Sequence, residues 1–290
     1  MWTGAIHLAD NLDALRGIAS GSVDLVYVDP PFNTGKRRTH TRLRTRRARA
    51  GDGTGVGGDR TGFGGHRYRT TRLGTLAFDD ARDDYLDFLA PRLAEARRVL
   101  APHGSLYVHL DWREVHYVKV LLDGIFGRDA FLNELVWSYD FGGRSRRRWA
   151  PKHDDILLYV KDPRRYHFDP GEVDRIPYLA PGLVGREKAA RGKLPTDSWW
   201  STIVPTCGAE RTGYPTQKPL AILRRVVAAS SRPGDLVLDF FAGSGTTGAA
   251  CLALGRRFVL VDDNPAALRV MARRFAGVPG IRWHGFSPGR

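Results

Sequence analysis

The sequence predicts an α/β protein with a doubly wound, mostly parallel Rossmann-like sheet, helices on both faces and a small inserted module. Short apolar runs of strand type alternate with longer segments of helical period, which is the pattern of consecutive βα units. One run, Val23–Val28, is rich in β-branched and aromatic residues, as expected for a strand buried on both faces. Asn264-Pro265 puts an N-cap residue before a proline, which indicates the start of a helix.

The same two patterns assign the remaining elements in chain order. Apolar or aromatic positions recur at helical spacing between 83 and 100, beginning with Tyr85, Phe88 and Leu89, and predict an amphipathic helix. The expected strands cover residues 4–8, 23–28, 105–110, 133–138, 155–161, 236–239 and 258–261. The expected helices cover residues 11–19, 83–100, 112–125, 219–229, 246–254 and 265–275.

Two segments lack an apolar period. Residues 36–73 are rich in Gly, Arg and Thr, and their glycine-rich centre at 51–58 predicts a flexible segment, largely disordered without a partner. The segment holds twelve Lys or Arg residues against Asp52 and Asp59, so it supplies 12 − 2 = +10 of the net charge of +14. Residues 162–211 contain many prolines and glycines and predict a small, mostly irregular module.

The net charge of +14 over 290 residues indicates a polyanionic partner. We expect DNA contacts from the first basic segment and from a second basic loop, through Lys36, Arg37, Arg38, Arg144, Arg146, Arg147, Arg148, Trp149 and Lys152. No uncharged run reaches the length of a membrane span, and no basic-then-apolar stretch marks a signal peptide. Cys207 and Cys251 have no paired spacing for a disulfide framework or a zinc site, so we expect a cytoplasmic protein with no metal.

The tetrapeptide Asp29-Pro30-Pro31-Phe32 directly follows the strand expected over 23–28. Two prolines fix the backbone, so the Asp29 carboxylate and the Pro30 carbonyl are held as two acceptors beside the Phe32 ring. This cluster suits a planar group with an NH2, such as the amino edge of a nucleobase stacked on Phe32. The alternative is a proline turn in which Asp29 caps a helix.

A second cluster, Asp239 to Gly245, reads Asp-Phe-Phe-Ala-Gly-Ser-Gly and lies where a strand turns into a helix. Glycines there let a ligand approach the backbone, and the helix start offers free N–H groups. Asp262 ends the next strand and is positioned to accept hydrogen bonds from ribose hydroxyls. Gly243 to Gly248 also fits G-x-G-x-x-G, with this acid nineteen positions after Gly243. A nicotinamide-dependent oxidoreductase therefore stays an alternative.

Taken together, Asp29-Pro30-Pro31-Phe32 and Phe241-Ala242-Gly243-Ser244-Gly245 resemble motifs of the S-adenosylmethionine-dependent DNA amino-methyltransferases. The motif order is like that of their beta class, with the catalytic motif first and the cofactor motif last. The segments 214–219, 231–235 and 255–257 are similar to further segments of that family. Phe240 departs from it, because the family usually has proline there, and the long basic insertion at 36–73 is unusual.

The resemblance implies how the chain is divided and what it binds. The catalytic half would be 1–35 with 74–161, followed by a DNA-contacting insertion at 36–73, a target-recognition region at 162–211 and a cofactor half at 212–290. The cofactor would be S-adenosyl-L-methionine and the partner double-stranded DNA. The cofactor residues carried over are Asp10, Asp29, Thr216, Gln217, Lys218, Asp239, Phe241, Ala242, Gly243, Ser244, Gly245 and Asp262. Within this set, Lys218 is expected to pair with the methionyl carboxylate.

By the same resemblance, Asp29 and the Pro30 carbonyl orient the amine of a flipped base for direct in-line attack on the sulfonium methyl. Asp as the first motif residue usually goes with adenine N6 and Ser with cytosine N4, so we expect an adenine enzyme, with cytosine N4 as the alternative. A further alternative is a nucleic-acid-binding protein without activity, which intact Asp29, Gly243 and Asp262 disfavour. The sequence leaves open both a cognate restriction nuclease and a homodimer.

Three aromatic side chains outside the two motifs are expected first in structural roles. His109 lies at the end of the strand expected over 105–110, and we expect it to pack or to cap, with lining of the pocket as the alternative. Trp199 and Trp200 are expected in the core rather than stacked on a base.

Overall fold

The computed structural model describes residues 2–33, 38–48, 59–61, 67–78, 84–205 and 207–289. The chain divides into two compact units, of which the larger is formed by Met1–Phe32 with Asp83–Arg290 and the smaller by Asn33–Arg82.

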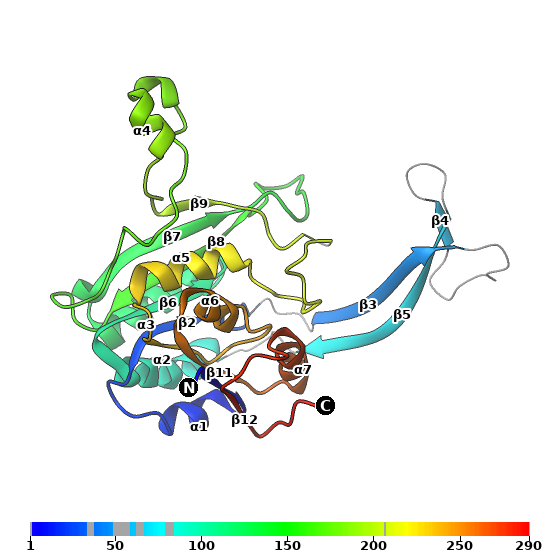
Figure 1. Ribbon diagram of the computed structural model, residues 1–290, viewed down its shortest axis with the longest axis horizontal. Coiled ribbons are helices and arrows are strands. Elements are labelled where there is room, and N and C mark those ends of the chain that lie inside the picture. The colour runs from blue at the N-terminus through cyan, green and yellow to red at the C-terminus, as the bar shows by residue number, and fades with distance from the viewer. Residues whose placement is uncertain are drawn as a thin grey trace. The chain divides into compact units, whose positions relative to one another are not determined.

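A nine-stranded sheet forms the centre of the larger unit (Figure 1). Its strands are β1 (Gly4–Leu8), β2 (Val23–Val28), β6 (Leu100–Leu110), β7 (Phe131–Ser138), β8 (His153–Val160), β9 (Ser198–Trp200), β10 (Leu236–Asp239), β11 (Arg257–Asp262) and β12 (Ile281–His284). The order across the sheet is β12-β1-β11-β10-β2-β6-β8-β7-β9. Only the pairings of β8 with β6 and with β7 are antiparallel. The predicted mostly parallel α/β fold is therefore confirmed.

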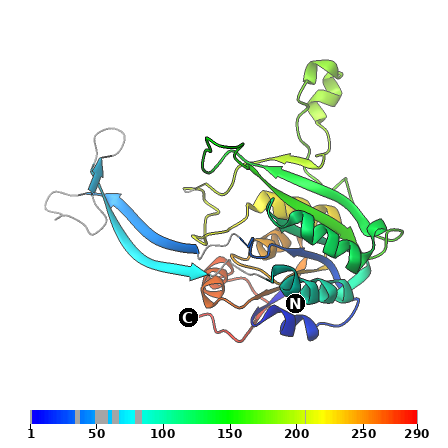
Figure 2. The same cartoon turned by 180° about the vertical axis from the view of Figure 1, so that it is seen from behind.

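Helices cover both faces of this sheet, as predicted. They are α1 (Asn11–Arg16), α2 (Tyr85–Val99), α3 (Val115–Phe126), α5 (Leu220–Ser230), α6 (Thr246–Leu254) and α7 (Pro265–Arg274), whereas α4 (Arg186–Arg191) belongs to the inserted module. One apolar cluster joins α1, α2 and α3 to Val26 and Val28 of β2. The other joins α5, α6 and α7 to Leu25 and Tyr27 of the same strand. Because successive strand residues point to opposite faces, β2 is buried from both sides; Figures 1 and 2 view the two sides.

The smaller unit contains a three-stranded antiparallel sheet in the order β3-β5-β4. β3 (Arg38–Arg47) pairs with β5 (Arg67–Phe78) along its whole length, and β4 (Asp59–Thr61) pairs with the start of β5. The expectation of a largely disordered segment is wrong for these strands. Strand pairing is made by backbone groups and needs no apolar period, and threonines at alternate positions along β3 favour an extended chain. The glycine-rich centre at 51–58 lies outside the described residues.

The module at 162–211 is mostly irregular, as its composition predicts. It contains a 3-10 turn (Pro181–Leu183), α4, which stands away from the sheet in Figure 1, and the short strand β9. β9 runs parallel to β7 and extends the main sheet. Neither β9 nor β12 is predicted from the sequence, because runs of three and four residues are too short to show a period. In the part of the chain that the structure describes, no helix is long and apolar enough to cross a membrane.

Candidate active site

Three neighbouring strands bring both sequence motifs to one edge of the sheet. β10 lies between β2 and β11 and runs parallel to both, so the three carboxyl ends meet. Asp29 follows β2, Asp239 ends β10 and Asp262 ends β11. Residues more than two hundred positions apart thus share the edge where open α/β sheets bind their ligands.

Asp29 is paired with an ammonium group above an aromatic ring. Lys218 Nζ lies 3.1 Å from Asp29 Oδ1, and both side chains are largely buried, with 11% of Lys218 and 16% of Asp29 exposed. The same Nζ lies 4.3 Å from the centroid of the Phe32 ring. Burial raises the pKa of Asp29, while Lys218 and His109 oppose that rise. In this structure Lys218 therefore binds the motif carboxylate, whereas the sequence predicts that it pairs with a cofactor carboxylate.

A buried polar network supports this pair from β6 and β8. Asp154 Oδ2 lies 3.6 Å from Lys218 Nζ and 3.1 Å from His109 Nε2, and the Tyr27 hydroxyl lies 2.8 Å from His109 Nδ1. Tyr139 donates to Asp154 Oδ1 at 3.0 Å. Burial and the nearby Lys218 lower the pKa of His109, so its imidazole is neutral at pH 7. A neutral ring that donates from Nε2 to the carboxylate accepts from Tyr27 at Nδ1.

The network also contacts the Phe32 ring. His109 lies nearly parallel to Phe32, with ring centroids 6.2 Å apart and planes inclined by 28°. His109 is fully buried, which confirms its expected packing role.

Burial opposes ionisation of Asp154, but Lys218 and His109 outweigh it and hold the pKa of Asp154 below its usual range. The sequence analysis misses Asp154, for which the only signal is a carboxylate at the start of a strongly apolar strand.

The glycine-rich turn between β10 and α6 has the backbone that its glycines permit. Gly243 and Gly245 have φ of 50° and 73°, in the left-handed region. A Cβ on Gly243 would lie 3.2 Å from a ring carbon of Tyr214, so even one added carbon would crowd the turn. The Gly243 amide donates to Asp262 Oδ2 at 2.7 Å, and the Ala242 amide donates to the Val261 carbonyl at 3.1 Å.

The two acids beside this turn serve first as its hydrogen-bond acceptors. Asp239 accepts from the Phe241 amide at 3.0 Å and from the Thr247 hydroxyl at 2.6 Å. Burial raises its pKa to about 7. Asp262 accepts from the amides of Gly243 and Asn264, and burial raises its pKa to about 6. Of the two, Asp239 is turned into the protein, with 3% of its surface exposed.

The other residues carried over as cofactor contacts are also held by the protein itself. Asp10 lies at this edge, because it follows β1, whose Leu8 is in register with Asp262. It caps α1 through the amides of Leu12 and Asp13 and pairs with Arg92 at 3.0 Å. The Ser244 hydroxyl contacts the Thr246 hydroxyl at 3.0 Å.

The segment before α5 contributes one side chain that closes a loop. The Gln217 side chain accepts from the Thr212 amide and hydroxyl and donates to the Glu210 carbonyl, so it stabilises the loop. Its neighbour Thr216 is exposed. Of the three predicted side chains in this segment, only Lys218 reaches the Asp29 carboxylate.

The second basic loop, residues 140–152, lies beside the same sheet edge. The Trp149 side chain is 97% exposed, and the Arg148 guanidinium lies 5.0 Å from the Trp112 ring centroid. Lys152 donates to the carbonyls of Phe141 and Gly142 at 2.8 and 2.9 Å. Arg144, Arg146 and Arg147 are exposed. Lys36 and Arg37 lie outside the described residues, as does the side chain of Arg38.

The two adjacent tryptophans of β9 have opposite environments. Trp199 is 7% exposed and lies in the core, as expected. The same expectation is wrong for Trp200, which is 78% exposed. Alternation along the strand places one side chain on each face, and only one face of β9 packs against the protein.

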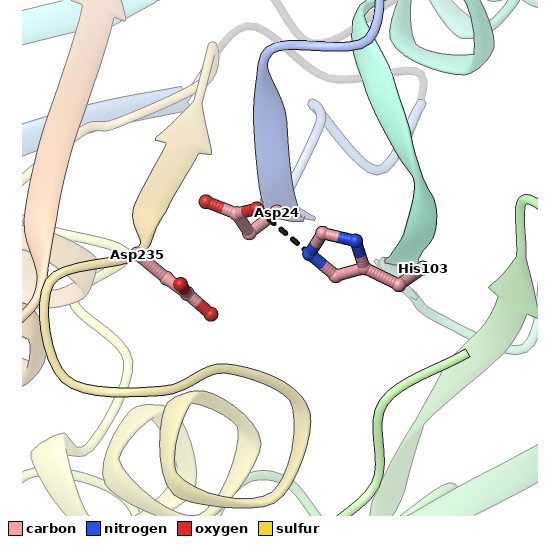
Figure 3. Close-up of side chains that lie close together, drawn as sticks. All are labelled: Asp24, His103 and Asp235. Atoms are coloured by element: carbon pink, nitrogen blue, oxygen red, sulfur yellow. Dashed lines mark hydrogen bonds and ion pairs between the residues drawn. The ribbon is translucent and has the colours of Figure 1, made fainter. Parts of the chain in front are cut away.

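A third polar cluster lies at the opposite edge of the sheet, at the amino ends of β2, β6 and β10 (Figure 3). Ligand-type atoms of Asp24, His103 and Asp235 lie within 4.8 Å of one another. Asp24 binds His103 Nε2 at 2.9 Å and accepts from the Leu236 amide at 2.7 Å, while Asp235 accepts from the Arg232 amide at 2.7 Å. These bonds connect neighbouring strands, and the cluster takes no part in the site at the carboxyl edge.

Comparison with known proteins gives one family. The model of the DNA methylase family matches residues 23–273. The chain is 31% identical to the type II methyltransferase M.HpaI of Haemophilus parainfluenzae over 263 residues, which cover 91% of this chain and 71% of that protein. It is 30% identical to the DNA adenine methyltransferase YhdJ of Escherichia coli (strain K12) over 282 residues, covering 93% and 81%.

A solved structure shares the fold at lower sequence identity. The cytosine-N4-specific PvuII DNA methyltransferase superposes with a TM-score of 0.64 at 15% identity, over 99% of this chain and 89% of that chain.

Proposed function

Because the chain belongs to the DNA methylase family, we propose that it transfers a methyl group from S-adenosyl-L-methionine to the N6 amino group of adenine in DNA. The observation that carries the proposal is the position of the Lys218 ammonium between Asp29 and Phe32. This N–H donor lies 3.1 Å from the Asp29 carboxylate and 4.3 Å from the centroid of the Phe32 ring. The exocyclic amine of a base stacked on Phe32 would need the same two neighbours.

The residues present fit the cofactor. The Tyr214 ring would crowd a Cβ on Gly243, and glycines in such a turn let a ligand approach the backbone closely. Asp262, whose pKa is about 6, is mostly ionised at pH 7, and its negative charge suits a cationic sulfonium and an α-amino group. Asp262 still has lone pairs for the ribose hydroxyls, because a carboxylate accepts about four hydrogen bonds. When bound, S-adenosylmethionine supplies an electrophilic methyl group.

The chain's own residues position the amine. Its lone pair is delocalised into the base, so the nitrogen is a poor nucleophile until it moves towards a tetrahedral geometry. Acceptance of its two N–H bonds by Asp29 and by the Pro30 carbonyl favours that geometry and directs the lone pair away from the acceptors. Lys218 has Asp154 Oδ2 as a second acceptor at 3.6 Å, so it can give up Asp29 to the base without losing a charged partner.

The base must leave the duplex to reach Asp29, which costs a few kcal/mol. Stacking on Phe32 returns roughly 1–3 kcal/mol. Phosphate contacts from Arg144, Arg146 and Arg147, together with the basic strands of the smaller unit, supply further free energy in this proposal. We further propose a cytoplasmic location, as expected from the free cysteines Cys207 and Cys251.

Adenine is preferred because the motif begins with Asp and because the relative YhdJ is named as an adenine enzyme. Cytosine N4 is the second candidate, favoured by the fold shared with the PvuII enzyme. The test uses S-adenosylmethionine with a trideuterated methyl group, unmethylated plasmid DNA and mass spectrometry of the released nucleosides. The proposal predicts trideuterated N6-methyldeoxyadenosine. Labelled N4-methyldeoxycytidine would instead establish the second candidate.

A further inference from the structure

A pocket of about 460 Å³ lies beside the active site and has no role in the mechanism above. Its lining includes Trp112, Arg148, Trp149, Lys152, His153 and Trp200. Its volume falls in the range of small-ligand sites in proteins. His153 directly precedes Asp154, and Trp112 follows β6, so the pocket adjoins the strand ends that position Phe32 and Lys218.

Exposed aromatic surface is the main feature of this pocket. Trp149 is 97% exposed and Trp200 is 78% exposed, and both side chains line the pocket. The Trp112 ring is engaged by two guanidinium groups, Arg113 at 4.8 Å and Arg148 at 5.0 Å from its centroid. Trp149 and Trp200 therefore provide the open ring faces.

The loop that supplies Arg148, Trp149 and Lys152 to the pocket is cationic. Residues 140–152 contain five Lys or Arg residues and one Asp, which gives the loop 5 − 1 = +4. The loop is folded by its own hydrogen bonds, from Lys152 to two loop carbonyls and from the amides of Arg147 and Arg148 to the Ser145 hydroxyl. The Arg148 guanidinium lies over the Trp112 ring, and a guanidinium that contacts an aromatic ring still has N–H donors that can bind a phosphate.

Exposed aromatic rings beside a guanidinium suit a nucleotide whose base is unstacked, because the base can stack on a ring while the phosphate binds the guanidinium. A paired base has both faces covered by its neighbours and cannot enter a pocket. We propose that this pocket binds a second, unpaired nucleotide of the substrate DNA, with its base against Trp149 and Trp200 and its phosphate against Arg148. The inference rests on the proposed function in one respect, that the polyanion is DNA. In this proposal the pocket does more than contact the duplex. When the target base leaves the stack, each neighbouring base loses one stacking partner, and the pocket can bind such a neighbour.

The test is a binding measurement on the full-length protein. Fluorescence anisotropy would compare two labelled duplexes of one sequence, one fully paired and one with two adjacent unpaired bases. The wild-type protein should prefer the second. The double variant Trp149→Ala/Trp200→Ala should lose about 5- to 150-fold in affinity for the unpaired DNA, the range that base–aromatic stacking provides, and little for the paired DNA.

Two further variants separate stacking from charge and from general surface effects. Arg148→Gln should weaken both complexes and lower the salt dependence of binding by roughly one phosphate contact. Phe168→Ala is the matched control: Phe168 is 50% exposed, and it follows His167, whose amide donates to the His103 carbonyl at the opposite sheet edge. This control should bind both DNAs as the wild type does.

Equal losses for paired and unpaired DNA in the double variant would overturn the inference, because the tryptophans would then be an ordinary duplex surface. No loss for either DNA would overturn it as well. The measurement needs no methyl transfer, so it can fail while nucleoside analysis supports the proposed adenine activity, and it can succeed if that analysis gives a different base.

Discussion

Replacing Lys218 with methionine should move the acid limb of the pH profile of kcat/KM to higher pH. The ammonium lies 3.1 Å from Asp29 Oδ1 and 3.6 Å from Asp154 Oδ2. Its removal leaves two largely buried carboxyl groups without their shared cation. Burial already raises the pKa of Asp29, and Lys218 is the strongest of the groups that oppose the rise.

The size of the change follows from the short distance. Coulomb's law at 3.1 Å with an effective dielectric constant of 20 gives an attraction of about 5 kcal/mol before relaxation of the site. Opposite charges this close ordinarily lower the pKa of a carboxyl group by about 1–3 units. We therefore expect Lys218→Met to raise the Asp29 pKa by about that amount.

The direction of the pH shift follows from the protonation state in which Asp29 is active. The ionised carboxylate is a much stronger acceptor of the base N–H than the protonated carboxyl group, so kcat/KM falls as pH drops through the pKa of Asp29. A raised pKa makes that fall begin at higher pH. The profile of kcat/KM reports groups of the free enzyme, which is the state in which Lys218 pairs with Asp29.

The assay measures transfer of a labelled methyl group to DNA at limiting DNA over a series of pH values, for wild type, Lys218→Met and Lys218→Arg. The arginine variant keeps the cation and should keep the acid limb near its wild-type position. An acid limb at the wild-type pH in a folded Lys218→Met protein would refute the electrostatic role of this lysine.

Four other variants test separate parts of the account. Asp29→Ala should abolish methyl transfer while calorimetry still detects binding of S-adenosylmethionine, and turnover at the wild-type rate would remove Asp29 from the mechanism. Gly243→Ala should weaken cofactor binding about tenfold, because φ is 50° and the new Cβ would lie 3.2 Å from the Tyr214 ring; unchanged affinity would show that the turn has room. Deletion of 37–72 should weaken DNA binding and reduce the slope of log K against log salt by roughly 5, if about six phosphates are contacted there; an unchanged slope would mean that this segment does not contact DNA. Asp239→Asn should flatten the pH dependence of stability. The folded-state pKa of Asp239 is raised to about 7, so the folded state binds more protons than the unfolded state, and stability falls as pH rises from about 4 to about 7, by up to roughly 4 kcal/mol. Urea unfolding at both ends of this window measures the loss, and an equal loss in the variant would contradict the assignment.

The elements nearest the motifs are the ones that the sequence predicts best. The bounds of β1, β2, β10 and α6 agree with the sequence analysis, because each has a clear apolar run closed by glycine, proline or aspartate. Parallel adjacency of β2, β10 and β11 then brings Asp29, Asp239 and Asp262 together, as the fold class requires.

The remaining parts of the site depend on contacts with no local signal. The pairing of Lys218 with Asp29 joins residues 189 positions apart (218 − 29) through a loop whose path no period predicts. Asp154 becomes part of the site only because β8 runs antiparallel beside β6. β3 and β5 were not predicted because their composition is polar. Backbone groups make the strand pairing, so a sequence rich in Arg and Thr gives no apolar pattern that indicates it.

Methylation-aware sequencing of DNA tests the central claim most directly. Genomic DNA would be taken from cells that lack other DNA methyltransferases and express either the wild-type chain or Asp29→Ala. The account predicts N6-methyladenine at one fixed sequence motif with the wild type and none with the variant. Methyl groups on cytosine N4, or the same adenine methylation in both samples, would contradict it.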